Sequence, residues 1–415
     1  MLELSLIETL AAGGLALFIG FVVVGRVAPL KRYNVPAAVV GGLLVALLVT
    51  LARVTSVLVI GFDTSLQMAL NTAFFTSIGL SASFSLLRAG SGQALLFLLL
   101  ASAFAVVQSL IGIGVAVAFG EHPLLGVLMS STALAGGPAT ALTFAPQFSA
   151  AGVPAAESVA IAAAMAGIVL GGIAGGPIAT RLLERNGVRP AAHAALTTCD
   201  EAVVDASASN DAASADDSAS EQDAASEEDG IRDTLKAIMI LLVAMVIGGW
   251  LSKGLSAAGV TLPGYVGAMI VGSLLRNLDD ATSWLKVPQR AAANAGTVCL
   301  TLFLTIALMN LKLWELAALA LPLFVNLLLQ LIAVALVCWG LVFRVMGRDY
   351  DAIVMTGGFT GFMLGTTANA VAVMRTLVER FGPAPRAFLV VPIVGAFFID
   401  FSNAIVITTF LNLLA

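Results

Sequence analysis

Long apolar stretches recur along this chain of 415 residues, and they constrain its fold more than any other feature. A helix needs about 20 apolar residues to cross the roughly 30 Å hydrocarbon core of a bilayer. We predict helices of about this length at 6–27, 35–53, 66–87, 93–118, 155–183, 234–254, 262–277, 290–310, 314–344 and 385–413. Only 11% of the residues are charged, against about 25% in soluble domains, so we expect an all-α polytopic membrane protein.

Two further apolar segments, 122–148 and 349–378, are each interrupted near the middle by small residues. The interruptions are Ala135-Gly136-Gly137-Pro138 and Gly365-Thr366-Thr367. The pieces on either side are too short to cross a bilayer and too apolar for a water-exposed loop. We therefore interpret both segments as re-entrant hairpins, and one ordinary span each is the alternative.

The two halves of the chain match at a nearly constant offset. A shift of 228 residues places Gly137 on Gly365 and Gly167 on Gly395, and a shift of 227 places Pro36 on Pro263. Such duplication is typical of transporters built from inverted repeats. Between the halves, residues 196–229 hold eleven Asp and Glu and no Lys or Arg, a composition that cannot offset the entropy cost of ordering. We expect a first repeat of five transmembrane helices at 1–185, a disordered acidic linker at 186–231 and an inverted second repeat at 232–415.

The placement of Lys and Arg predicts the orientation, because cytoplasmic loops carry an excess of positive charge. With five spans per half and the linker in the cytoplasm, seventeen of the twenty Lys and Arg residues lie on the cytoplasmic side. Only Arg53, Lys253 and Lys312 lie on the outer side. This places both termini in the periplasm of an inner-membrane protein. It also makes the first hairpin enter from outside and the second from inside.

Two such hairpins would bring broken helix ends together at the bilayer midplane. A helix N-terminus presents N–H groups that can hold a carboxylate, and unwound carbonyls suit Na⁺. Glycine lets the backbone approach a ligand closely, although glycines that only permit close helix packing are the alternative. The candidate substrate-binding residues are Gly136, Gly137, Thr140, Gly365, Thr366, Thr367 and Asn369.

Asp400 lies in the apolar run Phe397-Phe398-Ile399-Asp400-Phe401-Ser402-Asn403, where a charge costs about 2.5–3.5 kcal/mol. We expect its side chain to face the protein interior and to have a partner there. Asn403 is one helical turn further on and shares its face. We assign ion coupling to Asp400 and Asn403, with Thr367 as a further oxygen ligand for Na⁺. Proton transfer by Asp400 and a buried hydrogen bond between helices are the alternatives.

No motif of an enzyme or of an ATP-driven pump is recognisable. The sequence has no Gly-rich loop ending in Lys-Ser/Thr and no HExxH, and its three cysteines lack the spacing of a metal site. We therefore expect no enzyme activity, no cofactor beyond Na⁺ as coupling ion, and no nucleic-acid partner. Gln108, Asn326 and Gln330 are expected to form bonds between helices.

Several stretches resemble the bacterial sodium/glutamate symporters. They are Phe74-Phe75-Thr76-Ser77-Ile78-Gly79-Leu80, Leu311-Lys312-Leu313-Trp314-Glu315-Leu316-Ala317, Met346-Gly347-Arg348-Asp349-Tyr350-Asp351-Ala352, Glu379-Arg380-Phe381-Gly382-Pro383 and residues 387–400. The resemblance covers nearly the whole chain apart from the linker. It implies Na⁺-coupled uptake of glutamate, a homodimer in the bacterial inner membrane, and two five-helix halves with re-entrant loops.

The hairpin tips depart from the family pattern. The family usually has Gly-Gly-His-Gly and Gly-Ala-Thr-Pro-Thr, where this chain has Gly136-Gly137-Pro138-Ala139 and Gly365-Thr366-Thr367-Ala368-Asn369. The residues that carry over from the family are Gly136, Gly137, Gly365, Thr367, Asp400 and Asn403. We predict Na⁺-coupled symport of glutamate or a related anionic amino acid by alternating access. H⁺ coupling, a dicarboxylate substrate and a passive channel are the alternatives.

Overall fold

The computed structural model describes residues 2–28, 30, 35–54, 60–83, 91–187, 222–257, 264–311 and 319–414, and these are mostly helical. Elements of the first half are β1 (Leu2–Leu4), α1 (Leu6–Arg26), α3 (Ala37–Val54), β2 (Ile60–Phe62), α4 (Gln67–Ser81), α6 (Ser91–Ala118), α7 (Pro123–Val127), η1 (Leu128–Thr132), α8 (Gly137–Ala150) and α9 (Ala156–Asn186). Those of the second half are α11 (Gln222–Ala257), α12 (Gly264–Thr282), α13 (Gln289–Met309), α14 (Ala320–Val337), η4 (Cys338–Val342), α15 (Phe343–Val345), α16 (Tyr350–Met363), α17 (Thr367–Phe381), α18 (Pro385–Ile393), η5 (Val394–Phe398) and α19 (Ile399–Leu414). Linker residues 188–221, Pro263 and Lys312 lie outside the described residues.

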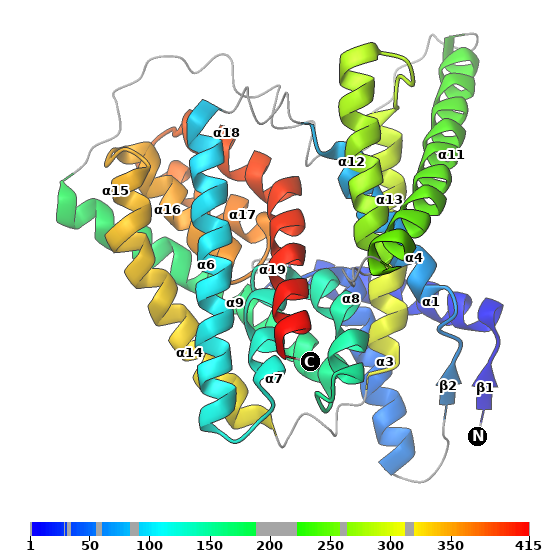
Figure 1. Ribbon diagram of the computed structural model, residues 1–415, viewed down its shortest axis with the longest axis horizontal. Helices are drawn as coiled ribbons and strands as arrows, with labels where there is room; N and C mark the ends of the chain where they lie inside the picture. Colours follow the sequence, from blue (N-terminus) through cyan, green and yellow to red (C-terminus); the bar gives the residue numbers. More distant parts are fainter. Residues whose placement is uncertain are drawn as a thin grey trace.

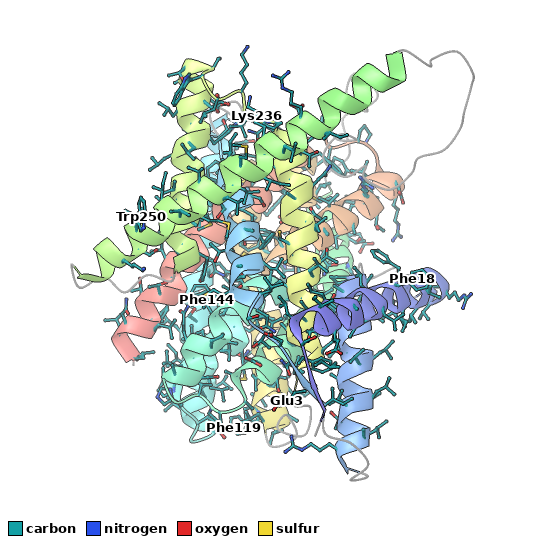
Figure 2. All side chains as sticks on the ribbon, turned by 90° about the vertical axis from the view of Figure 1, so that its right-hand side faces the viewer. Glu3, Phe18, Phe119, Phe144, Lys236 and Trp250 are labelled. Atoms are coloured by element: carbon teal, nitrogen blue, oxygen red, sulfur yellow. The ribbon has the colours of Figure 1, made fainter. Side chains whose placement is uncertain are left out.

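Six helices within the described ranges are long and apolar enough to cross a membrane. They are Leu6–Arg26, Gly92–Ala118, Ala156–Asn186, Gly230–Gly254, Gln289–Met309 and Ala320–Val345. All six coincide with predicted helices. The chain is therefore a multi-pass helical membrane protein. Phe18 on α1 and Trp250 on α11 point outward and are 65% and 69% exposed, as expected for side chains that face lipid (Figure 2).

Three local features differ from the predictions. Helix α11 begins at Gln222, so the prediction of disorder is wrong for residues 222–231, where acidic residues favour a helix N-terminus. The predicted helix at 385–413 contains a wider π-helical turn, η5, which begins two residues after Pro392. The proline lacks the N–H that would continue the regular hydrogen-bond ladder. The strands β1 and β2 form an unpredicted parallel pair in which Leu2 lies opposite Ile60.

The helices form two bundles that lie side by side in Figure 1. We call α1, α3, α4, α11, α12 and α13 the first bundle, in which α4 packs against both α12 and α13. The second bundle consists of α6 to α9 and α14 to α19. Between them, α8 contacts α13, and α12 contacts α19. Phe144 of α8 is fully buried there, with its ring centroid 5.6 Å from that of Tyr265 on α12.

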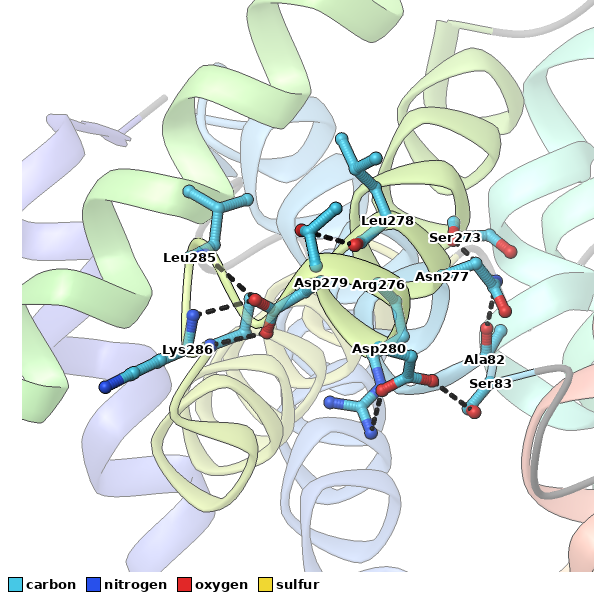
Figure 3. A network of polar contacts seen from close by, with 12 residues as sticks. Ala82, Ser83, Ser273, Arg276, Asn277, Leu278, Asp279, Asp280, Leu285 and Lys286 are labelled. Atoms are coloured by element: carbon cyan, nitrogen blue, oxygen red, sulfur yellow. Dashed lines mark hydrogen bonds and ion pairs between the residues drawn. The ribbon is translucent and has the colours of Figure 1, made fainter.

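A polar network fixes the end of α12 (Figure 3). The Asp279 carboxylate accepts backbone N–H bonds from Leu285, Lys286 and Val287 at 2.7–2.8 Å. Next to it, Asp280 pairs with Arg276 at 2.9 Å. These bonds hold the turn between α12 and α13, because they satisfy the backbone N–H groups of three successive residues that precede α13.

Close helix crossings in the second bundle depend on glycines. On α9, a Cβ at Gly171 would lie 3.2 Å from the carbonyl oxygen of Gly361, and one at Gly175 would lie 3.1 Å from that of Gly357. The two helices therefore run past each other almost backbone to backbone. This crossing presses α9 against α16, one of the two helices that lead into the second interruption.

Candidate functional site

Both segments with predicted interruptions are pairs of short helices. In the first, α7 and η1 end at Thr132, and α8 begins at Gly137, whose φ of +67° is the left-handed conformation that glycine tolerates. In the second, α16 ends at Met363 and α17 begins at Thr367. Thr366 caps α17 by accepting the backbone N–H of Asn369 at 3.4 Å.

The second pair folds back on itself. The hydroxyl of Tyr350, at the start of α16, donates to the carbonyl oxygen of Gly382, just after α17, across 2.6 Å. Asp349 caps α16 and accepts Arg386 Nη2 at 2.6 and 2.7 Å. The outer ends of α16 and α17 therefore lie together, and the interruption forms the tip of a helical hairpin.

The two tips meet. A Cβ at Gly137 would lie 3.2 Å from Cγ2 of Thr366 and 3.8 Å from the carbonyl oxygen of Gly365. Gly137 starts α8 and Thr366 caps α17, so two helix N-termini converge at one point. Each N-terminus offers unpaired N–H groups and a partial positive charge of about half an electron. The arrangement can hold an anion such as a carboxylate.

Three further polar residues near the tips, Thr143, Thr367 and Asn369, have defined hydrogen-bond partners. Thr143 donates to Asn71 Oδ1 of α4 at 2.7 Å, which ties α8 to the first bundle. Thr367 donates to the carbonyl oxygen of Gly395 at 2.6 Å, and Asn369, 1% exposed, donates to that of Ile168 at 2.6 Å. Thr140 is 3% exposed and packs beside Gly136. Thr367 and Asn369 lie near the tip, and their hydrogen bonds also hold α17 against η5 and α9.

Asp400 and Asn403 differ in their surroundings. Asn403 is fully buried, donates to the carbonyl oxygen of Ser131 at 3.0 Å, and has no partner for Oδ1 among the described residues. The half-buried Asp400 makes no hydrogen bond or ion pair with the described residues, so its expected partner stays a prediction. Asp400 is the second residue after η5, and such π-helical turns are frequent at functional sites.

A buried polar network lies beside the first interruption, and sequence reasoning missed the residues Ser130 and Ser131 within it. The backbone of η1 is irregular at Ser130, with φ −110° and ψ −113°. Asn326 of α14 donates to the carbonyl oxygen of Met129 at 2.9 Å, and Gln330 donates to Ser130 Oγ at 3.0 Å. The run Ser130-Ser131-Thr132 inside an apolar segment is the signal that could have revealed this network.

Helix α6 connects this network to the second hairpin. Gln108 donates from Nε2 to the carbonyl oxygen of Met363 at 2.8 Å, while its own backbone oxygen accepts Gln330 at 2.8 Å. The next residue, Ser109, shares a 2.7 Å hydrogen bond with Ser131. The prediction that Gln108, Asn326 and Gln330 bond between helices agrees with these contacts.

Four fully buried side-chain oxygens of this region lack a partner within the described residues. They are Gln108 Oε1, Thr132 Oγ1, Gln330 Oε1 and Asn403 Oδ1. An unsatisfied buried acceptor costs about 1–3 kcal/mol, so a native structure retains several only for a reason. Neutral oxygens of this kind suit a hard cation that prefers oxygen ligands.

Long apolar helices, interrupted helix pairs and polar tips that converge inside the second bundle define a multi-pass helical membrane protein. The family described as sodium/glutamate symporter matches residues 2–383, and the chain belongs to this family. It is 38% identical over 418 residues to the sodium/glutamate symporter of Escherichia coli, covering 100% of this chain and 99% of the relative. It is 37% identical over 406 residues to that of Haemophilus influenzae, covering 96% and 95%. Membership indicates a transporter.

Proposed function

We propose that this chain is a secondary active transporter that couples Na⁺ entry to uptake of glutamate or a related anionic amino acid by alternating access, and is not an enzyme. The convergence of the N-termini of α8 and α17, so close that a Cβ added to Gly137 would lie 3.2 Å from Cγ2 of Thr366, carries the proposal. It offers two sets of N–H donors to a substrate with two carboxylates. The printed names of the relatives, sodium/glutamate symporter, support this substrate and ion.

The chain consists of two inverted repeats in this proposal. The order of helices supports it, since corresponding elements begin at similar offsets. Helices α3 and α12 begin at 37 and 264, α8 and α17 at 137 and 367, and α9 and α18 at 156 and 385. These offsets are 227, 230 and 229 residues. In Figure 1, α7 lies toward the lower edge and α16 toward the upper edge, which supports re-entrant hairpins that enter from opposite sides.

The upper edge of the molecule faces the cytoplasm of a bacterium, and the protein lies in the inner membrane as a homodimer. Lys236 lies at this upper edge, while Glu3 and Phe119 lie at the lower edge, in agreement with an excess of positive charge inside (Figure 2). Both termini are then periplasmic, and the acidic linker is cytoplasmic. No nucleic acid takes part.

The substrate contacts Gly136, Gly137, Thr140, Gly365, Thr366, Thr367 and Asn369 around the two tips. Na⁺ is held by Asp400 and Asn403, with Thr367 as the third ligand predicted from the sequence. The unpartnered oxygens of Asn403 and Gln330 support a cation in this region, because neutral oxygens are suitable ligands for Na⁺. No cofactor other than this ion is required.

H⁺ coupling is the second candidate, since Asp400 makes no bond or ion pair with the described residues and is in a position to bind a proton instead. Uptake of labelled glutamate into proteoliposomes tests both. Under our proposal an inward Na⁺ gradient drives accumulation, and a pH gradient without Na⁺ does not. Accumulation driven by pH alone would favour H⁺, and equilibration without accumulation would indicate a channel. Competition by other amino acids and dicarboxylates then defines the substrate.

Replacement of Asp400 by Asn tests the residue itself. Asp400→Asn should abolish accumulation driven by Na⁺. Glu379→Gln, an exposed acid on α17, removes the same charge and should leave uptake unchanged. Normal concentrative uptake by Asp400→Asn would remove Asp400 from the coupling mechanism.

A further inference from the structure

Four arginines from two helices line one pocket at the edge of the second bundle. The pocket has a volume of about 570 Å³ and lies between the end of α9 and the η4–α15 segment. Arg181 and Arg185 are one helical turn apart near the end of α9. Arg344 lies in α15, and Arg348 follows in the next turn. No carboxylate lines this pocket, which we call the arginine pocket.

The four guanidinium groups form no ion pair within the described chain. Like charges that line one pocket repel one another, so an anion bound among them would be stabilised. The backbone contributes to the arrangement, since Gly347 and Arg348 have φ values of +124° and +58°. A left-handed conformation costs a non-glycine residue about 1–2 kcal/mol, and here it turns the chain so that Arg348 lines the same pocket as Arg344.

The wall of the arginine pocket is apolar. It includes Leu336, Trp339 and Phe343, and Leu336 and Trp339 are 64% and 38% exposed. The exposed hydrophobic side chains of α14 continue this wall along the helix. They are Leu321, Phe324, Leu328, Leu329, Ile332 and Leu336. Tryptophan commonly lies at the boundary between lipid and headgroups, so the pocket opens where a lipid headgroup meets its acyl chains.

We propose that the arginine pocket binds the headgroup of an anionic phospholipid with two phosphates, of the diphosphatidylglycerol type. Two pairs of guanidinium groups match two phosphodiesters, which arginine recognises through paired N–H donors. The acyl chains lie along the exposed face of α14, and this apolar path favours a lipid over a dissolved phosphate. In Figure 1 the pocket helix α15 lies toward the upper edge, where Lys236 lies in Figure 2. Basic pockets between membrane helices on the cytoplasmic side bind such headgroups.

Native mass spectrometry of the purified full-length protein tests the proposal. Diphosphatidylglycerol, phosphatidylglycerol, phosphatidylcholine and soluble glycerol phosphate are titrated separately. We expect one diphosphatidylglycerol per chain to bind more tightly than the other three. The double variant Arg344→Gln/Arg348→Gln should weaken this binding by about tenfold or more, because each basic residue contributes to anionic lipid binding.

The control variant Arg232→Gln/Arg375→Gln removes two exposed arginines of α11 and α17 that lie outside the pocket. It changes the net charge equally and should bind the lipid like the unchanged protein. Unfolding temperatures without added lipid verify that both variants fold. Unchanged lipid affinity in Arg344→Gln/Arg348→Gln overturns the proposal. So does phosphatidylcholine or glycerol phosphate that binds as tightly as diphosphatidylglycerol.

Discussion

Asn403 Nδ2 lies 3.0 Å from the backbone oxygen of Ser131 and donates a hydrogen bond to it. This bond joins α19, which carries Asp400, to the irregular turn that ends the first half of the α7–α8 pair. The residue expected to couple the ion is therefore attached directly to the segment that leads to the Gly137 tip. A change in ion occupancy at Asn403 would therefore affect the Gly137 tip.

Asn403→Ala removes this bond and leaves the backbone N–H of Gly136 as the remaining donor to the Ser131 oxygen. We expect a loss of about 0.5–1.5 kcal/mol of stability for the lost hydrogen bond and a higher Na⁺ concentration for half-maximal uptake. Ser402→Ala is the control, because Ser402 on the same helix bonds Ser102 at 2.9 Å instead. Thermal unfolding and Na⁺ titration of uptake measure the two effects. An unchanged Na⁺ dependence in Asn403→Ala would separate Asn403 from the ion.

Gly137→Ala places a methyl group 3.2 Å from Cγ2 of Thr366 at a residue with φ +67°. The left-handed backbone costs alanine about 1–2 kcal/mol, and the methyl group occupies the space between the tips. We expect uptake to fall by about tenfold or more. Gly176→Ala on α9, where an added Cβ meets nothing within 4 Å, should keep normal uptake. Equal activity of the two variants would contradict a functional role of the Gly137 contact.

Gln330→Met keeps the volume of a fully buried side chain but removes its donors to Ser130 and Gln108 and its unpartnered oxygen. We expect weaker Na⁺ activation and a loss of about 1–3 kcal/mol of stability. Gln147→Met, near the outer end of α8, makes the same chemical change away from the network. Sodium titration of uptake measures the difference. A loss of stability with unchanged Na⁺ activation would assign Gln330 a structural role only.

Asp279 makes the stability depend on pH. Burial acts to raise the pKa of its carboxyl, but three backbone donors and Arg276 outweigh burial, so the pKa lies below its ordinary 3.8. A carboxyl whose pKa is lowered by folding stabilises the fold above its unfolded pKa, and this contribution is lost as the pH falls through the folded pKa. Asp279→Asn should therefore unfold at a lower temperature at pH 7, with a difference that narrows below pH 3.8. The control Asp233→Asn changes an exposed residue and should leave the unfolding temperature unchanged at both pH values. If the difference in unfolding temperature for Asp279→Asn did not depend on pH, the stabilising role of the ionised Asp279 would be refuted.

The apolar pattern predicts most helices because a span must be long enough to cross the bilayer. Lipid also offers no hydrogen bonds to backbone N–H and C=O groups, so the span must be helical. It also locates the interruptions at Gly136 and Gly365, where small residues stand inside otherwise apolar segments. The pattern does not reveal which helices form each bundle, because lipid-facing and protein-facing sides are equally apolar. The close approach of Gly171 to Gly361 could not be predicted either, because the two glycines lie on helices that are far apart in the sequence.

The hydrogen-bond partners of buried polar residues are harder to predict from the sequence than the positions of these residues. Asn403 was recognised from its spacing to Asp400, but its bond to Ser131 joins residues 272 positions apart. Gln108 was correctly expected to bond between helices, yet no local pattern identifies the carbonyl oxygen of Met363 as its acceptor. Such long-range pairs depend on the tertiary packing and leave no periodic signal in the sequence.

Ligand protection of cysteines at the two tips tests the central claim most directly. In a chain without Cys199, Cys299 and Cys338, single cysteines replace Ala139 on α8 or Ala368 on α17, beside the meeting point of Gly137 and Thr366. We predict that glutamate slows thiol labelling at both positions, and only when Na⁺ is present. Protection at one tip alone, or labelling at both that is indifferent to glutamate and Na⁺, would contradict a ligand site shared by the two hairpins.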